Sequence, residues 1–143
     1  MSGTGFPRDV IDTVNERSGE LCEAALPGCE GRAVDIQHRR PRGMGGTAKR
    51  ARAGLHTNCP CNAVAACRAC HGWMESHAPE ARVLGLAITQ HETEPPSSLP
   101  VLLRGGVVLL GCDGSTSPAS LIDLDEVDEA WVMSADHRDK EWT

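Results

Sequence analysis

The sequence contains no tyrosine, and its 143 residues include only one phenylalanine and three tryptophans. Because base-by-base binding of single-stranded nucleic acid uses aromatic side chains, this scarcity argues against that class of protein. No apolar stretch reaches the roughly 18 residues that a membrane-spanning helix requires. Charged residues also occupy the amino-terminal segment, where a signal peptide would be apolar. These absences predict a cytoplasmic protein that does not enter membranes.

Seven cysteines are available to stabilise a core that is poor in aromatic residues and contains 15 glycines and nine prolines. In the cytoplasm thiols stay reduced, so metal binding is favoured over disulfides. Two spaced pairs offer the four soft ligands that tetrahedral zinc prefers, and buried core or redox thiols are the alternative. Cys59 and Cys61 are a further source for one ligand. We therefore predict a structural zinc site formed by Cys22, Cys29, Cys67 and Cys70.

The charges are unevenly distributed along the chain. Residues 30–54 carry seven basic side chains against two acids, whereas residues 112–143 carry nine acids against two basic side chains. A dense basic segment predicts contact with a polyanion such as nucleic acid. The acidic segment predicts a solvated flank or a competitor for the basic segment.

Hydrophobic spacing and turn residues predict the secondary structure. We expect a helix over 8–17, a strand over 32–37, an exposed loop over 39–53 and a helix over 71–84 that Pro79 kinks or divides. We also expect a hairpin of strands 101–103 and 107–112 around Gly105-Gly106, and a partly helical segment over 121–133. The mixture predicts an α+β fold.

The residues between and around the cysteine pairs form a longer pattern. Gln37 and His38 precede a basic, glycine-rich loop that contains Gly45-Gly46, Asn62 lies five residues before Cys67, and His71 directly follows Cys70. As an ordered set, these residues resemble the zinc-containing HNH endonucleases, particularly those encoded by bacteriophages of actinobacteria. The resemblance covers about residues 16–85.

The resemblance implies a small ββα-metal core with a structural zinc knuckle. Together with the hairpin and the acidic segment, which the residue patterns predict, this divides the chain into four parts: a lead of residues 1–15, the nuclease domain of 16–88, a linker and hairpin of 89–114, and the tail of 115–143. The resemblance implies that His38 is the general base and that Asn62 orients this base or helps to hold the cation. His71 would bind a catalytic divalent cation, Mg²⁺ or Mn²⁺ or another, and its rival role is on the structural zinc.

Gln37 departs from the family pattern, because many members have aspartate or histidine there as a cation ligand. An amide oxygen binds Mg²⁺ more weakly than a carboxylate does. Glu75 lies four residues after His71, and on a helix the two project from one face, so Glu75 is a candidate to complete the site. His77 is six residues from His71 and should point elsewhere.

Basic residues near His38 are predicted to hold the phosphates of double-stranded DNA without reading its sequence. These candidates are Arg39, Arg40, Arg42, Lys49 and Arg50. The remaining histidines, His56, His91 and His137, are expected to be surface residues.

The predicted function is hydrolysis or nicking of double-stranded DNA with one divalent cation and a histidine base. By analogy with the phage proteins it resembles, the chain is expected to act in DNA packaging with a terminase partner. The alternative is a noncatalytic zinc-containing DNA-binding or adaptor module, which Gln37 favours.

Overall fold

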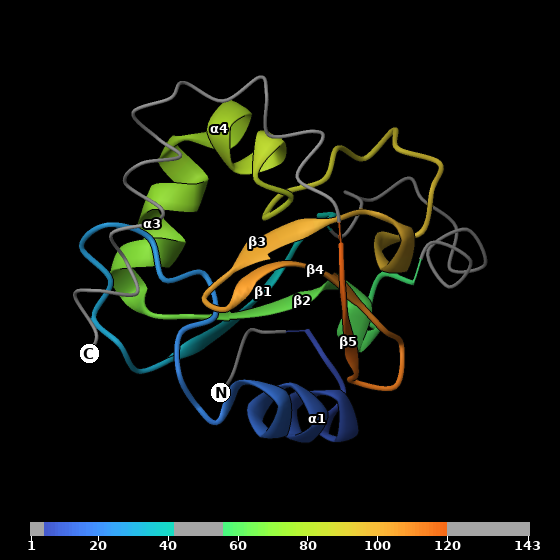
Figure 1. Ribbon diagram of the computed structural model, residues 1–143, viewed down its shortest axis with the longest axis horizontal. Coiled ribbons are helices and arrows are strands. Elements are labelled where there is room, and N and C mark those ends of the chain that lie inside the picture. The colour runs from blue at the N-terminus through green and yellow to red at the C-terminus, as the bar shows by residue number, and fades with distance from the viewer. Residues whose placement is uncertain (1–4, 42–55, 120–143) are drawn as a thin grey trace.

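The computed structural model describes residues 5–41 and 56–119, which form a small α+β fold with two antiparallel sheets (Figure 1). The helices are α1 (Arg8–Ser18), α3 (Arg68–Ser76) and α4 (Ala78–Val83), with short 3-10 helices η1 (Pro60–Asn62) and η2 (Pro96–Ser98). The strands are β1 (Asp35–His38), β2 (Ala63–Ala66), β3 (Val101–Leu103), β4 (Gly106–Leu110) and β5 (Thr116–Pro118). Within these ranges, every helix is too short or too polar to cross a membrane.

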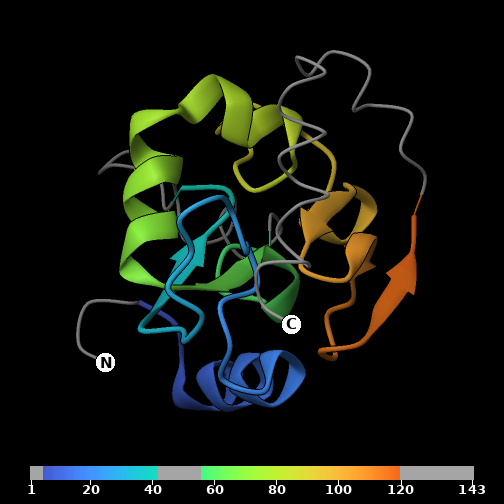
Figure 2. The same ribbon diagram turned by 60° about the vertical axis from the view of Figure 1, so that its left-hand side comes forward.

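The first sheet is a two-stranded ribbon of β1 and β2, paired from Asp35 opposite Ala66 to His38 opposite Ala63. Side chains alternate between the two faces of a strand. One face of the ribbon contributes Ile36 to an apolar cluster with α1, and the other face packs on α3. The ribbon thus lies between α1, which is below it in Figure 1, and the pair α3 and α4 on its other side (Figures 1 and 2).

A buried ion pair fixes α1 to this ribbon. Arg17 Nε and Nη2 donate to the two carboxylate oxygens of Glu23 at 2.8 and 2.7 Å, and both side chains are less than a tenth exposed. Arg17 also donates to the carbonyl oxygens of Pro60 and Ala63, while Glu23 accepts the Ala65 N–H at 2.9 Å. Burying two charges costs desolvation free energy, and these additional hydrogen bonds to Arg17 and Glu23 offset that cost.

The single helix predicted over 71–84 is two helices. Proline lacks an N–H and disfavours helical backbone in the residue before it, so α3 ends at Ser76 and α4 begins at Ala78, next to Pro79. The helix also begins earlier than predicted, because Cys67 Sγ caps it by accepting the Cys70 N–H at 3.4 Å. His71 is therefore the fourth residue of α3.

The second sheet confirms the predicted hairpin and extends it. Leu103 pairs with Gly106, whose φ of 128° suits glycine at the turn between β3 and β4. Strand β5 then pairs with β4, from Leu110 opposite Thr116 to Val108 opposite Pro118. The sequence prediction assigned residues 115–118 to a tail because their serine, threonine and proline content resembles a loop. The helical prediction over 121–133 lies outside the described residues.

The first predicted strand is shorter and starts later than expected. Residues 32–34 lie outside a named strand, and an isolated bridge joins Leu21 to Arg32 before β1 begins at Asp35. The pattern that predicted a strand there is the alternation of Ala33, Val34 and Ile36. His38 is the last residue of β1 rather than the residue that follows it.

Candidate functional site

The four predicted zinc ligands converge, and we call them the four-cysteine cluster. Two come from the loop between α1 and β1, and two come from the start of α3. Their sulfur atoms lie within 4.8 Å of one another, and all four residues are buried. The sulfurs of Cys29 and Cys67 are 3.8 Å apart, which is the separation of about 3.8 Å that tetrahedral zinc with Zn–S bonds of about 2.3 Å requires. The cluster can therefore hold a metal ion such as zinc.

The surroundings of these sulfurs suit thiolates. Backbone N–H groups donate to three of them at 3.3–3.4 Å: Leu26 to Cys70, Glu30 to Cys67 and Gly31 to Cys29. An S–H hydrogen bond from Cys70 lowers the pKa of the Cys22 thiol to about 5, while burial raises the pKa of Cys29 to about 11. All seven cysteines are free thiols. The site therefore already favours one thiolate before a metal ion supplies positive charge for the others.

A second group, which we call the mixed cluster, was not predicted. It consists of His56, Cys59, Cys61 and Cys112, whose ligand atoms also lie within 4.8 Å of one another. The prediction that His56 is a plain surface residue is wrong, and so is the suggestion that Cys59 or Cys61 serves the other cluster. The spacing His56-x2-Cys59-x-Cys61 is a signal that could have indicated a site, but Cys112 lies in the distant second sheet.

His71 lies between two carboxylates. Its Nδ1 is 3.1 Å from Asp35 Oδ2, and its Nε2 is 2.9 Å from Glu75 Oε1. Asp35 comes from β1, and Glu75 comes from one turn later on α3, as predicted from the four-residue spacing. We call these three residues and Gln37 the cation face, because Gln37 shares the face of β1 that carries Asp35.

Gln37 lacks the negative charge that many family members have at this position, and a neighbouring residue carries one. Asp35, which sequence analysis did not single out, supplies a carboxylate two residues before Gln37, and strand alternation was the signal for it. The Oε1 atom of Gln37 is buried and has no hydrogen-bond partner among the described residues. A buried polar oxygen without a partner is costly, and a bound cation would satisfy it. The two carboxylates bind opposite sides of the His71 ring. Among the described residues, the four-cysteine cluster and the mixed cluster are the groups of histidine, cysteine or acidic side chains whose ligand atoms converge.

The rival role of His71 on the structural zinc is not supported, because cysteines supply all four ligands of that cluster. His77 points elsewhere, as predicted: its ring stacks on Trp73 with centroids 4.8 Å apart. His91 is exposed, also as predicted. His137 lies outside the described residues.

His38 projects from the opposite face of the ribbon. Its ring stacks on Phe6, with centroids 3.9 Å apart, and its Nε2 lies 3.1 Å from Asn58 Oδ1. Because an amide oxygen only accepts, the bond places the proton on Nε2 and the lone pair of the neutral ring on Nδ1. Asn58 is therefore the residue that orients the ring, and sequence analysis missed it.

Asn62 holds two backbone segments together. It is fully buried, its Oδ1 accepts the Arg40 N–H at 2.8 Å, and its Nδ2 donates to the carbonyl oxygens of Arg40 and Thr57. It contacts neither the cation face nor the His38 ring through these bonds. Asn62 thus clamps the backbone after His38 to the backbone before Asn58, which is the kind of contact that the predicted role of orienting the base requires; these bonds do not bear on the alternative role of holding the cation.

Arg39 and Arg40 are not available for phosphate contacts, which corrects the sequence prediction. Both are about 1% exposed. The Arg39 guanidinium donates to four carbonyl oxygens, those of Cys61, Gly85, Pro96 and Leu99, and burial lowers its pKa to about 10, so it stays charged at neutral pH. Arg40 Nη2 donates to the carbonyl oxygens of Glu92 and Glu94. The two arginines lie in a basic segment, which predicted phosphate contacts rather than this structural role. Arg42, Lys49 and Arg50 lie outside the described residues.

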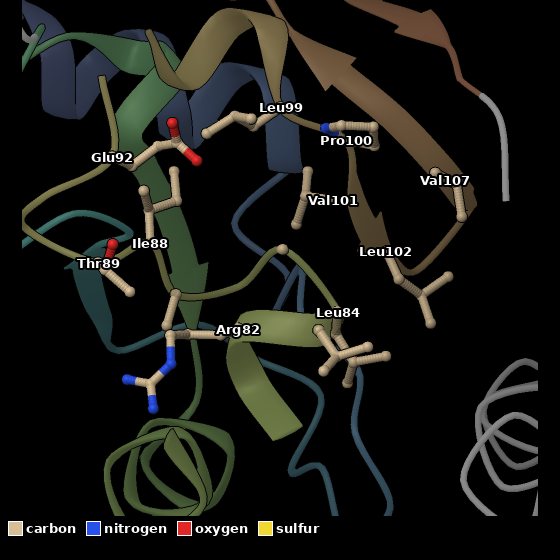
Figure 3. A pocket seen from close by; sticks show the side chains of 13 residues that line it. Arg82, Leu84, Ile88, Thr89, Glu92, Leu99, Pro100, Val101, Leu102 and Val107 are labelled. Carbon is tan, nitrogen blue, oxygen red and sulfur yellow. The ribbon is translucent and has the colours of Figure 1, made fainter. Parts of the chain in front are cut away.

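A cavity of about 200 Å³ lies between the end of α4 and β3, away from these groups (Figure 3). Leu84, Ile88 and Val101 line it, with Arg82 and Glu92 at its edge. It contains no histidine or cysteine. Its lining therefore offers no set of side chains for metal or nucleophilic chemistry.

Comparisons of the chain with protein-family models, with curated proteins and with solved structures found no match. The two clusters offer sulfur and imidazole ligands, whereas the cation face offers mainly oxygens. Among the described residues, the two clusters are the groups that could hold a metal ion such as zinc.

Proposed function

We propose that the chain is a zinc-stabilised endonuclease of the HNH type, which hydrolyses phosphodiester bonds of double-stranded DNA with one divalent cation. The observation that carries the proposal is the cation face, in which β1 and α3 bring Asp35, His71 and Glu75 together. A helix packed on a two-stranded ribbon, with a cysteine cluster bracing the start of the helix, is the arrangement that the resemblance to HNH endonucleases implies.

In the proposed mechanism a divalent cation would be held by one ring nitrogen of His71, by Gln37 and by the carboxylate next to that nitrogen, while the other carboxylate stays on the second ring nitrogen. Such a cation would neutralise charge on the phosphate and on the leaving 3′ oxygen. Asp35 and Glu75 provide the negative charge, which Gln37 lacks. Asp35 is the partner of Nδ1 of His71, and Glu75 is the partner of Nε2. The ring nitrogen that does not bind the cation therefore keeps its carboxylate, and a carboxylate in that place orients a ligating imidazole.

His38 is the proposed general base and would take the proton from water. Because His38 is the last residue of β1, the base and the cation can act on one phosphate only where the DNA crosses this end of the ribbon. The hydrogen bond from His38 to Asn58 fixes the tautomer, and the Phe6 ring supports its orientation. Asn62 acts as a positioning residue, because it joins the segments that carry His38 and Asn58.

Double-stranded DNA remains the proposed substrate because of the basic segment. Since Arg39 and Arg40 are buried, the proposed phosphate contacts are reduced to Arg42, Lys49 and Arg50. A terminase partner and a role in phage packaging remain predictions.

Conversion of supercoiled plasmid tests the proposal. The purified full chain should cut with Mg²⁺ or Mn²⁺ and not with EDTA. Asp35→Asn should slow cleavage strongly, because it removes a charge from the cation face. Asp9→Asn changes an exposed aspartate of α1 and serves as the matched control.

Cleavage in EDTA at the same rate would contradict the cation mechanism. If the chain binds the plasmid and retards it on a gel but does not cut it with any of the cations, the noncatalytic DNA-binding module becomes the better account. Gln37, the weak ligand in the cation face, is the observation that favours that second candidate.

A further inference from the structure

The mixed cluster has the geometry of a zinc site. The His56 Nδ1 atom lies 3.5 Å from Cys112 Sγ. Zinc with a sulfur ligand at about 2.3 Å and an imidazole nitrogen at about 2.0–2.1 Å would hold these two atoms about 3.6 Å apart in a tetrahedron. The other two ligands, Cys59 and Cys61, bring the set to three sulfurs and one nitrogen, all within 4.8 Å.

We propose that the mixed cluster binds a second zinc ion, which fastens the β3–β4–β5 sheet to the turn that precedes β2. Three thiolates and one imidazole are a common ligand set of structural zinc, whereas Mg²⁺ and Ca²⁺ prefer oxygen. The proposal does not depend on the proposed function, because the mixed cluster shares no residue with the cation face. It also shares none with the four-cysteine cluster.

The two parts of the cluster come from separate elements. His56, Cys59 and Cys61 lie in the turn and in η1 just before β2, whereas Cys112 follows the end of β4. A tight turn presents Cys112, because the Gly111 N–H donates to the Ser115 carbonyl oxygen at 2.8 Å. A metal ion bound by both parts would therefore cross-link the second sheet to the entry of the ribbon.

The backbone of the turn fits this role. His56 has a φ of 59°, a left-handed conformation that residues other than glycine seldom adopt. Such conformations persist where the surroundings hold them in place and are concentrated at ligand sites. The Cys59 N–H donates to the His56 carbonyl oxygen at 3.2 Å, and this bond closes the turn that brings the two side chains together.

The cross-link would also fix residues around His38. The segment between His56 and Cys59 contains Thr57, whose carbonyl oxygen accepts from Asn62, and Asn58, which contacts the His38 ring. Because His56 and Cys59 flank these two residues, one zinc ion bound to both ligands would restrict the backbone of Thr57 and Asn58. The consequence can be measured as protection of the amides of residues 57–62 from hydrogen exchange.

Zinc content per chain is the first test, measured by elemental mass spectrometry on the full chain expressed with zinc. We expect two zinc ions in the unaltered protein and one in Cys112→Ser. His91→Ala, at an exposed histidine outside both clusters, is the matched control and should keep two. His56→Ala should hold one, and His56→Cys, which offers a sulfur instead of the nitrogen, should restore the second.

One zinc ion in the unaltered chain, or equal zinc content in Cys112→Ser and the unaltered chain, would overturn the proposal. If Cys112→Ser fails to fold by circular dichroism, the difference between His56→Ala and His56→Cys decides the matter. Loss of one zinc ion in Cys112→Ser should also raise exchange of the 57–62 amides about tenfold. Unchanged exchange in a variant that has lost that zinc ion would overturn the fastening role.

Discussion

The two cysteine clusters differ in where their ligands come from and in how deeply they lie. The four-cysteine cluster is buried and joins the loop before β1 to the start of α3 inside the main core. The mixed cluster includes the exposed Cys112 and joins a turn to the second sheet. The difference teaches that a metal ion in the four-cysteine cluster would support the main core from within, whereas one in the mixed cluster would fasten a surface element to that core.

Replacing one ligand of the buried cluster should have the largest effect. In Cys67→Ser the lost sulfur is also the cap of α3, and a structural zinc ion contributes an apparent binding free energy of about 10–16 kcal/mol to folding. That exceeds the free energy of unfolding of many domains, about 5–15 kcal/mol. We expect an unfolded protein by circular dichroism. A cooperative melt at the unaltered temperature would show that this cluster does not support the fold.

Arg39→Met tests whether the turn near the mixed cluster is held by contacts other than metal. The substitution leaves four carbonyl oxygens without their donor, including that of Cys61. Buried groups left unsatisfied cost about 1–3 kcal/mol each, so the free energy of unfolding should fall by at least about 3 kcal/mol in urea denaturation. Arg82→Met, at an exposed arginine, is the control, and equal effects of the two substitutions would contradict the role of Arg39.

Cys112→Ser applies the same chemical change as Cys67→Ser to the exposed cluster. Because Arg39 and Arg17 still hold the segment around η1, the loss should be on the order of 1–3 kcal/mol, as for an ordinary destabilising substitution. Thermal melting of the two cysteine variants side by side is the measurement. Equal destabilisation by both would remove the distinction between the clusters.

The smallest effect on stability is expected from Glu75→Gln. Its side chain is 69% exposed, and exposed substitutions usually change the free energy of unfolding by less than about 0.5 kcal/mol. The Mn²⁺ concentration for half-maximal plasmid cleavage should nevertheless rise about tenfold or more, because the cation face loses a carboxylate. Glu80→Gln, in the first turn of α4, should leave both quantities unchanged. An unchanged Mn²⁺ requirement in Glu75→Gln would remove Glu75 from the cation face.

The sequence predicted the four-cysteine cluster because two ordered pairs of cysteines carry a strong spacing signal. It could not predict the mixed cluster, because Cys112 is a single cysteine whose neighbours are determined by the packing of the second sheet. The hairpin was predictable from Gly105-Gly106 between apolar runs, but β5 has the composition of a loop and is a strand only because β4 offers it an edge.

The candidate site shows the same limit. The spacing of His71 and Glu75 on a helix was sufficient to bring them together. The burial of Arg39 and Arg40 was not predictable, because their partners are backbone carbonyl oxygens from distant segments, which leave no mark in the sequence. For the same reason Asn58 was missed, because a tertiary contact rather than its place in a motif brings it to the His38 ring.

Cleavage of supercoiled plasmid in Mn²⁺ by the zinc-loaded chain, compared with His38→Ala prepared identically, tests the central claim most directly. A general base contributes about 10²–10⁴-fold to a rate, and His38 belongs to neither cluster and lies on the ribbon face opposite the cation face. The account therefore predicts a variant that melts as the unaltered chain does, keeps its zinc and cuts at least about 100-fold more slowly. Cleavage by His38→Ala at the unaltered rate would contradict it.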